Sequence, residues 1–440
     1  MRNRLRYAVV GGGPGGCTLA WHLIRNGHEV HLYERENGLG GLAAPVPFGK
    51  TFLDRFYHHI FTSDTHVRAF VERLGLQDKL HWCDSSVGFE HRGKLYPFTT
   101  PADLLRFRPL SPLSRIRVGL AVLKMRMRNT YEDLENVTAE AWIIRQMGEP
   151  AYRVLWEPLL RSKFGERYRE VSAVWFWGKV KLRGGTRSKQ GTGECLGYLK
   201  DGWGQIFDRM GEAIAARGGR IRLHEMVRQI APSGARLSVR TRSGVEEFDR
   251  VIVTPSIPAF VEMTPSLPDE YKAAVGRVAY QGNITMLLGL KRTLSPYYWL
   301  NITDPDSPFV AMIEHTRLFP DPDYGEWVPV YLSRYLSAEH PYYSMRIPEV
   351  RELFLSHVER MFPGFQREWI CSFTFSKAPY AQPVIGLHYS RTIPAYETPL
   401  PGLFLCTMAQ IYPQDRGMNY SMKIAEDLLV RLGELETSSA

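Results

Sequence analysis

Four residues near the beginning of the chain have the types and spacing that bind phosphate and ribose groups. Gly11, Gly13 and Gly16 stand in G-x-G-x-x-G spacing directly after the apolar run at residues 7–10. Glycine at these positions permits a tight turn off a strand, lets the backbone approach a pyrophosphate and lets a helix pack closely on a sheet. Glu34 ends the next alternating run, where a carboxylate accepts hydrogen bonds from ribose hydroxyls. Together the four residues predict a dinucleotide site.

A β-turn-α-β unit is needed to position these residues, and the sequence supplies one. Residues 7–10 and 29–33 read as strands, and a helical pattern lies between them. The N-terminus of that helix offers unpaired N–H groups and a positive dipole end to the phosphates. Pro14 and Gly15, which lie within the turn, therefore join the predicted site.

A second glycine cluster follows the ribose-binding acid. Arg35 is followed after a short interval by Gly40, Gly41 and Leu42, a cluster that a plain nicotinamide site does not need. The arrangement resembles the FAD-binding signature of the superfamily of flavin amine oxidases, protoporphyrinogen oxidase, phytoene desaturase and UDP-galactopyranose mutase. This resemblance implies FAD as the cofactor, with these residues and Glu34 at its ribose and pyrophosphate. Leu42 stands where the family often has arginine.

The resemblance extends to distant segments of the chain. In the superfamily a strand like residues 221–223 precedes a residue, here Val227, whose backbone pairs with adenine, and another buried strand ends here at Thr254. The strand at 401–408 and the helix opening at Gly417 resemble the C-terminal flavin motif. In that motif the helix N-terminus stabilises negative charge on the reduced flavin. The residues implied there are Met408, Asp415, Gly417, Met418 and Asn419.

The resemblance covers most of the chain and implies the fold class and the domains. We expect an α/β, Rossmann-type (doubly wound) FAD-binding domain interleaved with an α+β substrate domain that contains a mainly antiparallel sheet. The FAD-binding domain is predicted to be discontinuous, formed by residues 1–86, 198–257 and 400–436. The substrate-binding domain is predicted to comprise residues 87–197 and 258–399.

Several polar residues near the predicted flavin are candidates for catalysis. The segment at 56–61 resembles the part of the superfamily that folds back across the flavin, and only one of His58 and His59 can face the ring, because neighbours on an extended segment point to opposite sides. A structural role in the core is the alternative for each histidine. Tyr412 and Arg416 end the second flavin motif. The candidates for substrate contact, in the strand-rich and aromatic second half, are Tyr297, Tyr298 and Arg334.

The resemblance implies a flavin-dependent oxidoreductase of the protoporphyrinogen oxidase-like group. Such an enzyme transfers hydride between flavin N5 and an apolar, ring-shaped or lipid-like small molecule. The protein has mainly to orient the reactants and to exclude water from the site. The alternative is an isomerase resembling UDP-galactopyranose mutase, which needs arginines for a sugar-nucleotide diphosphate. Arg183, Arg187, Arg334 and Arg416 are candidates for that role. A flavin-bearing binding protein without turnover is the third class.

Composition limits the number of domains, the class of protein and its cellular location. Its 440 residues suffice for two domains, and the 44% hydrophobic content is that of a globular protein. The five cysteines are scattered without C-x-x-C spacing, which predicts a reducing cytoplasm and no metal site. The sequence goes directly into a strand without a signal peptide, and it has no apolar run of the ~18 residues that span a membrane.

A basic segment accounts for most of the net charge of +9. Residues 106–128 contain seven cations and no acids, and five apolar residues at helical spacing form a stripe: Leu113, Ile116, Leu120, Leu123 and Met127. Such a helix suits peripheral contact with an anionic membrane surface, an ordinary helix covering the substrate domain, or an anionic-ligand site. No recognition motif accompanies these charges, so nucleic acid is not predicted as a partner.

Two further segments have no derived mechanism. Residues 157–165 resemble a stretch of protoporphyrinogen oxidase-like proteins. Residues 179–204 are basic and rich in glycine, which makes their backbone costly to order. They suit either a loop that closes on an anionic substrate or a surface connector.

Overall fold

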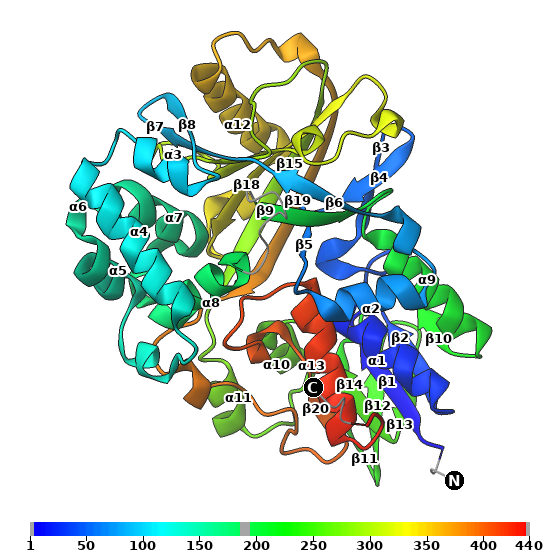
Figure 1. Cartoon of the computed structure of the whole chain (residues 1–440). Coiled ribbons are helices and arrows are strands. Elements are labelled where there is room, and N and C mark those ends of the chain that lie inside the picture. Colours follow the sequence, from blue (N-terminus) through cyan, green and yellow to red (C-terminus); the bar gives the residue numbers. More distant parts are fainter. Residues whose placement is uncertain (1–3, 185–193, 437–440) are drawn as a thin grey trace.

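The protein combines a parallel sheet, a large and mostly antiparallel sheet and a group of helices (Figure 1). The structure is a computed structural model that describes residues 4–184 and 194–436. The segment 179–204 therefore lies partly outside the described residues, and Arg187 lies wholly outside them. Within the described residues, no helix combines the length and the hydrophobicity that crossing a membrane requires.

The parallel sheet has five strands and is buried on both faces. Successive residues of its central strand, such as Tyr7 and Ala8, face two different hydrophobic cores and are fully buried. This is typical of a parallel sheet that is covered on both sides. Helices α1 (Pro14–Arg25), α9 (Gly204–Ala216) and α13 (Met418–Arg431) pack together beside the sheet. The strands, in spatial order, are β10 (Arg220–Arg222), β2 (Glu29–Tyr33), β1 (Arg6–Val10), β14 (Arg250–Val253) and β20 (Leu403–Leu405).

A seven-stranded sheet forms the second layer. Every neighbouring pair in it is antiparallel except β16–β7, which is parallel. Helix α12 (Ile347–Met361) packs on one face through a separate apolar core. The strands, in spatial order, are β19 (Ile370–Pro383), β15 (Tyr280–Leu290), β18 (Val328–Leu336), β17 (Ala311–Glu314), β16 (Trp299–Asn301), β7 (Val87–His91) and β8 (Lys94–Pro97).

The predicted fold class is confirmed by these two sheets. All five parallel strands come from the three segments assigned to the FAD-binding domain, and all seven strands of the second sheet come from the two segments assigned to the substrate domain. The exact domain boundaries stay a prediction.

Smaller sheets and short helices complete the fold. A three-stranded antiparallel sheet joins β11 (Gln229–Ser233), β12 (Arg236–Arg240) and β13 (Val245–Phe248). A second one joins β5 (Ile60–Phe61), β9 (Glu194–Leu199) and β6 (Leu80–Ser85), and β3 (Pro45–Phe48) pairs with β4 (Thr51–Asp54). The short helices α2 (Thr65–Arg73), α10 (Ile257–Met263) and α11 (Asp269–Val275) complete this set.

A group of helices covers one side of the molecule. Thr100 caps α3 (Pro101–Arg106) in a capping box with Asp103, and the Ser111 side chain caps α4 (Pro112–Met127). Helix α4 packs on α5 (Ala139–Met147) and on α8 (Ala173–Gly184), and α6 (Glu149–Ala151) and α7 (Glu157–Phe164) complete the group.

The apolar stripe of α4 points away from the protein. Val118, Ala121 and Met125 are the residues that α4 buries against its neighbours. The stripe from Leu113 to Met127 lies on the other side of the helix and is exposed to solvent. Helix α4 does cover its neighbours, but it does so through this second apolar face and not through the stripe.

Candidate flavin-binding site

A cavity of about 720 Å³ runs between the turn after β1 and the start of α13. Its lining joins residues from the beginning, the middle and the end of the chain. The predicted cofactor residues that line it are Gly11, Gly13, Pro14, Gly15, Glu34, Arg35, Gly41, Leu42, Val227, Thr254, Met408, Gly417 and Met418. Gly16, Gly40, Asp415 and Asn419 do not, and each has a different role in the structure.

The turn after β1 has almost no room for side chains. Gly11 has a φ of +99°, and its O accepts a hydrogen bond from the Thr254 hydroxyl at 3.3 Å. A Cβ atom built on Gly16 would lie 1.8 Å from the carbonyl O of Gly11, so Gly16 is required for packing. A Cβ atom on Gly13 would meet no protein atom within 4 Å, because Gly13 faces the cavity. This is the open cradle that a pyrophosphate needs.

The carboxylate of Glu34 is fixed by the backbone. One oxygen accepts from Gly12 N at 2.6 Å and the other from Glu36 N at 2.9 Å. The side chain is buried at the end of β2, where it still lines the cavity. Each oxygen keeps lone-pair capacity for a ribose hydroxyl, so the geometry fits the predicted role.

The second glycine cluster packs against the first turn. Gly40 has a φ of +109° and donates its N–H to Gly12 O at 2.8 Å. A Cβ atom on Gly41 would lie 3.1 Å from the Cα of Gly13. Gly40 therefore holds the glycine turn in place without lining the cavity, whereas Gly41 and Leu42 form part of the cavity wall.

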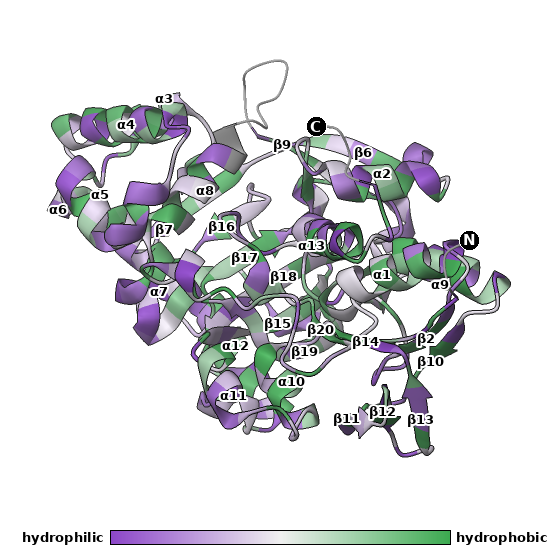
Figure 2. Ribbon diagram, turned by 90° about the horizontal axis from the view of Figure 1, so that it is seen from below, coloured by the Kyte–Doolittle hydropathy of each residue, from purple (hydrophilic) through white to green (hydrophobic). Residues whose placement is uncertain are grey.

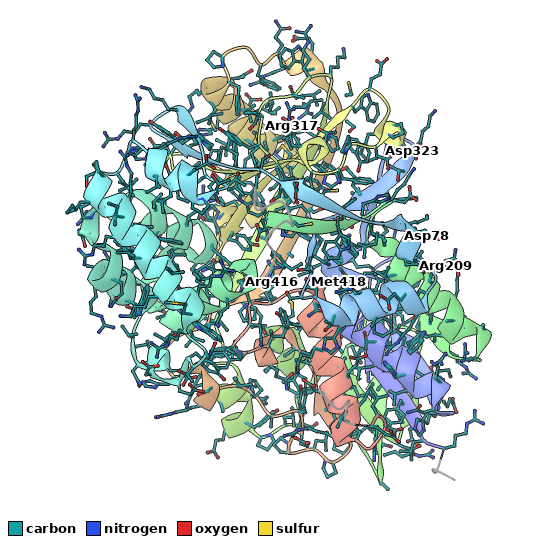
Figure 3. The ribbon with its side chains drawn as sticks, viewed as in Figure 1. Asp78, Arg209, Arg317, Asp323, Arg416 and Met418 are labelled. Atoms are coloured by element: carbon teal, nitrogen blue, oxygen red, sulfur yellow. The ribbon has the colours of Figure 1, made fainter. Side chains whose placement is uncertain are left out.

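The start of α13 forms the far end of the cavity. Met408, Arg416, Gly417 and Met418 line it there, and Figure 3 shows Arg416 and Met418 in the middle of the molecule, near the large sheet. Asn419 instead accepts hydrogen bonds from His66 N and Val67 N at the start of α2.

Asp415 is the centre of a buried polar cluster. Its carboxylate lies 2.7 Å from Lys163 Nζ and 2.5 Å from Lys179 Nζ. It also accepts from Trp175 Nε1 at 3.3 Å and from Gln382 Nε2 at 3.1 Å. Burial raises the pKa of Asp415, but Lys163, Lys179 and the neighbouring Arg416 outweigh it and hold the pKa well below its ordinary value. Burial lowers the pKa of Lys163 even though Asp415 opposes that change.

The same cluster orients Arg416. Arg416 donates from Nε to Gln382 Oε1 at 3.1 Å and from Nη2 to the Tyr335 hydroxyl at 2.8 Å. The side-chain amide of Gln382 thus bonds both Asp415 and Arg416. Its position on β19 and that of Tyr335 on β18 hold the guanidinium at the cavity wall.

Of the two adjacent histidines, the structure brings His58 to the cavity. Its Nδ1 contacts the Phe56 carbonyl, which fixes the tautomer with the proton on Nδ1. Burial and Arg416 lower the pKa of His58 to about 4, so the ring is neutral at pH 7. His59 Nδ1 instead lies 3.1 Å from the hydroxyl of Tyr298, and His59 is not part of the cavity lining.

The remaining sequence candidates lie elsewhere. The Tyr412 hydroxyl donates to Glu135 in the helical region, and Tyr297 packs over Gly88 on β7. Arg334 pairs with Ile284 across the sheet, on the face that α12 covers, and donates to Ser307 O at 2.7 Å. Tyr335, the next residue, takes the opposite face because side chains alternate along a strand.

Sequence reasoning missed most of the cluster around Asp415. Lys163 and Lys179 come from α7 and α8, and Gln382 comes from β19, so no local spacing connects them. One signal was present, because Lys163 lies within the stretch 157–165 that resembles protoporphyrinogen oxidase-like proteins. Arg55 and Lys377 also line the cavity without having been predicted.

Asp54 is a further buried acid near this region. Burial raises its pKa to about 8, although Trp203 N donates to it at 2.9 Å and opposes the rise. Its ordinary pKa is 3.8, so between these values the folded protein binds a proton that the unfolded chain has lost. The free energy of unfolding must therefore fall as pH rises through this window.

We expect Asp54→Asn to remove this pH dependence, because asparagine keeps an acceptor for Trp203 N and cannot ionise. The variant and the parent should be similarly stable near pH ~4, and the variant more stable near pH ~9. Urea unfolding at several pH values measures the effect. A parent protein whose unfolding free energy does not change between pH ~5 and ~8 would contradict the assignment.

Known proteins resemble this chain at both the sequence and the fold level. The family model for flavin containing amine oxidoreductase matches residues 15–414. The carotenoid phi-ring synthase of Streptomyces griseus is 32% identical over 189 residues, which is 38% of this chain and 36% of that protein. The chain therefore aligns with only about a third of that relative's length.

Two solved structures share the fold. A putative protoporphyrinogen oxidase from Exiguobacterium sp. 255-15 superposes with a TM-score of 0.79 at 17% identity, over 99% of this chain and 100% of that one. Reduced UDP-galactopyranose mutase superposes with a TM-score of 0.75 at 16% identity, over 98% of this chain and 96% of that one. Both likenesses concern architecture alone.

Proposed function

Because the chain belongs to the flavin containing amine oxidoreductase family, we propose that it is an FAD-dependent enzyme that transfers hydride between flavin N5 and an apolar, ring-shaped or lipid-like substrate. The single observation that carries FAD is the continuous cavity from Glu34 and Val227 to Arg416. It joins a nucleotide-binding turn to a second helix N-terminus, as a dinucleotide with a flavin at one end requires.

Three features of the chain match the cofactor. Gly13 leaves open space at the first turn, the Glu34 oxygens keep acceptor capacity, and α13 begins at the opposite wall. Bound FAD supplies the hydride acceptor or donor, and the chain supplies binding, orientation and exclusion of water. In this proposal Arg416 and the neutral His58 contact the flavin or the substrate, and Lys163 and Lys179 position Arg416 through Asp415.

The aromatic residues beside the cavity support an apolar substrate. The Tyr57 ring lies 4.8 Å from the Trp299 ring and 6.0 Å from the Tyr331 ring, centre to centre. Tyr335 occupies the same face of β18 as Tyr331 and bonds Arg416. The name of the carotenoid phi-ring synthase points to a substrate of the same apolar class.

The mutase-like alternative receives less support from the arginines. Arg416 lines the cavity, whereas Arg334 lies on the α12 face of the sheet. Arg183 belongs to α8, but its side chain is outside the described residues, as is the whole of Arg187. Of the two candidate arginines whose side chains the structure describes, only Arg416 therefore lies where it could bind a sugar-nucleotide diphosphate.

The proposal is tested in two steps on the purified protein. We expect flavin absorbance near ~450 nm and release of FAD on denaturation. We then expect anaerobic mixing with a panel of polyene and cyclic apolar compounds to bleach or restore this band as hydride moves. Absence of flavin would refute the cofactor. Interconversion of UDP-galactopyranose and UDP-galactofuranose by the reduced protein, without net electron consumption, would instead establish the isomerase.

The cysteines support a reducing location. All five are free thiols in the structure, which fits our proposal that the protein works in the cytoplasm. Cell fractionation tests this location, and recovery from an oxidising compartment would contradict it.

A further inference from the structure

Helices α3 and α4 present large apolar side chains to solvent. We call this set the α4 stripe; its members are Leu105, Leu113, Ile116, Leu120, Leu123 and Met127. The exposed fraction is 51% for Leu123, the least exposed of the six, and 78% for Leu113, the most exposed. An exposed apolar patch of this kind marks an interaction surface in a folded protein. Figure 2 shows α3 and α4 along the outer edge of the molecule, with hydrophobic colouring along α4.

The orientation of α4 is fixed by the protein. Val118, Ala121 and Met125 anchor its other face in the core. At its C-terminal end, Trp177 of α8 donates from Nε1 to Arg128 O at 3.0 Å. The helix therefore cannot turn its stripe inward without losing a packed face.

Cations flank the stripe in a segment of the chain that carries no acid of its own. Residues 104–131 contain no aspartate or glutamate. Arg115 and Arg117 donate to backbone carbonyls, including those at the C-terminal ends of α3 and α5, which orient the guanidinium groups without a carboxylate partner. Arg128 is neutralised by an ion pair with Asp133. The cations in this segment are Arg106, Arg108, Arg115, Arg117, Lys124, Arg126 and Arg128.

We propose that the α4 stripe docks the protein peripherally on an anionic lipid surface. Six large apolar side chains provide the part that enters the headgroup region, and the flanking cations meet the lipid phosphates. A second copy of the chain fits this surface poorly. Stacking stripe on stripe would bring Arg117, Lys124 and Arg126 against the same cations of the other copy, with no acid on either helix.

The docking surface lies one helix away from the candidate flavin site. Helix α4 packs on α8, and α8 carries Trp175 and Lys179, both of which contact Asp415 beside Arg416. A lipid-dissolved substrate would thus meet the protein near the reactive end of the cavity. The docking inference stands on the stripe and its charges alone, and it does not depend on the proposed hydride transfer.

Sedimentation with vesicles tests the proposal on the full chain. We expect the parent protein to sediment with vesicles of roughly one third phosphatidylglycerol in phosphatidylcholine, to bind pure phosphatidylcholine at least about tenfold more weakly, and to be released by salt. Leu120→Glu with Leu123→Glu should abolish binding. Arg117→Gln with Lys124→Gln should weaken it by about tenfold or more.

Matched controls lie on other exposed helices. Ile347→Glu with Leu353→Glu alters two exposed apolar residues of α12, and Arg209→Gln with Arg217→Gln removes two exposed cations on or next to α9. Both pairs should bind vesicles as the parent does, and denaturant unfolding checks that every variant is folded. A parent that stays in the supernatant overturns the proposal. So does a dimer of the parent that Leu120→Glu and Leu123→Glu convert to monomer without any vesicle binding.

Discussion

Gly13→Ala is expected to fold and to lose flavin, whereas Gly16→Ala is expected to lose the fold itself. A Cβ atom on Gly13 meets no protein atom and enters the cavity, so the methyl group competes only with the cofactor. On Gly16 the same atom would lie 1.8 Å from Gly11 O, which forces the helix off the sheet. We expect the unfolding free energy of the apo-protein to change by about 1 kcal/mol or less for Gly13→Ala and to fall by about 4 kcal/mol or more for Gly16→Ala.

Denaturant unfolding of the apo-proteins and absorbance near ~450 nm separate the two effects. Gly364→Ala is the matched control, because a Cβ atom there also meets no protein atom and the residue is not part of the cavity lining. It should keep both stability and flavin. Full flavin binding by Gly13→Ala would show that the pyrophosphate does not lie against this turn.

Asp415→Asn is expected to destabilise the protein by about 3 kcal/mol or more, because Lys163, Lys179 and Arg416 would lose the carboxylate that compensates them. The amide cannot neutralise buried cations, although it can still accept from Trp175. Denaturant unfolding at neutral pH should show this loss of unfolding free energy. We also expect weaker flavin binding, because Arg416 would no longer be held in place by Asp415.

An exposed ion pair supplies the comparison for this variant. Asp427 pairs with Lys423 one helical turn away on α13, and both side chains are nearly half exposed to solvent. Asp427→Asn should therefore cost about 0.5 kcal/mol or less. Equal losses for the two variants would mean that the Asp415 cluster does not act as a buried charge network.

The nucleotide half of the site was predictable from sequence because its determinants are local. The turn from Gly11 to Gly16 and the acid at Glu34 lie within one β-turn-α-β unit, and each requirement is set by backbone geometry a few residues away. The structure brings these residues to one cavity. The parallel and antiparallel sheets were expected because the resemblance to the flavin-enzyme superfamily implies them, whereas hydrophobic patterns alone indicated only some of their strands.

The reactive half of the site was not predictable because it depends on tertiary contacts. Lys163 and Lys179 meet Asp415 across more than two hundred positions of sequence. Whether Arg334 or Tyr335 reaches Arg416 depends on the register of β18, because a shift of one residue moves every side chain of the strand to the other face. The direction of the α4 stripe was equally undetermined, because the helix carries two apolar faces and periodicity alone does not say which one is buried.

The start of α13, which closes the far end of the cavity, is among the last parts of the chain to be synthesised. On the ribosome, Gly417 emerges after the glycine turn, after the whole seven-stranded sheet and after the helices that provide Lys163 and Lys179. Until then β14 lacks its neighbour β20, and α1 lacks its packing partner α13. The last strand of the parallel sheet and the far end of the cavity are therefore both completed by the final part of the chain to be synthesised, and before that β14 has no partner on one side.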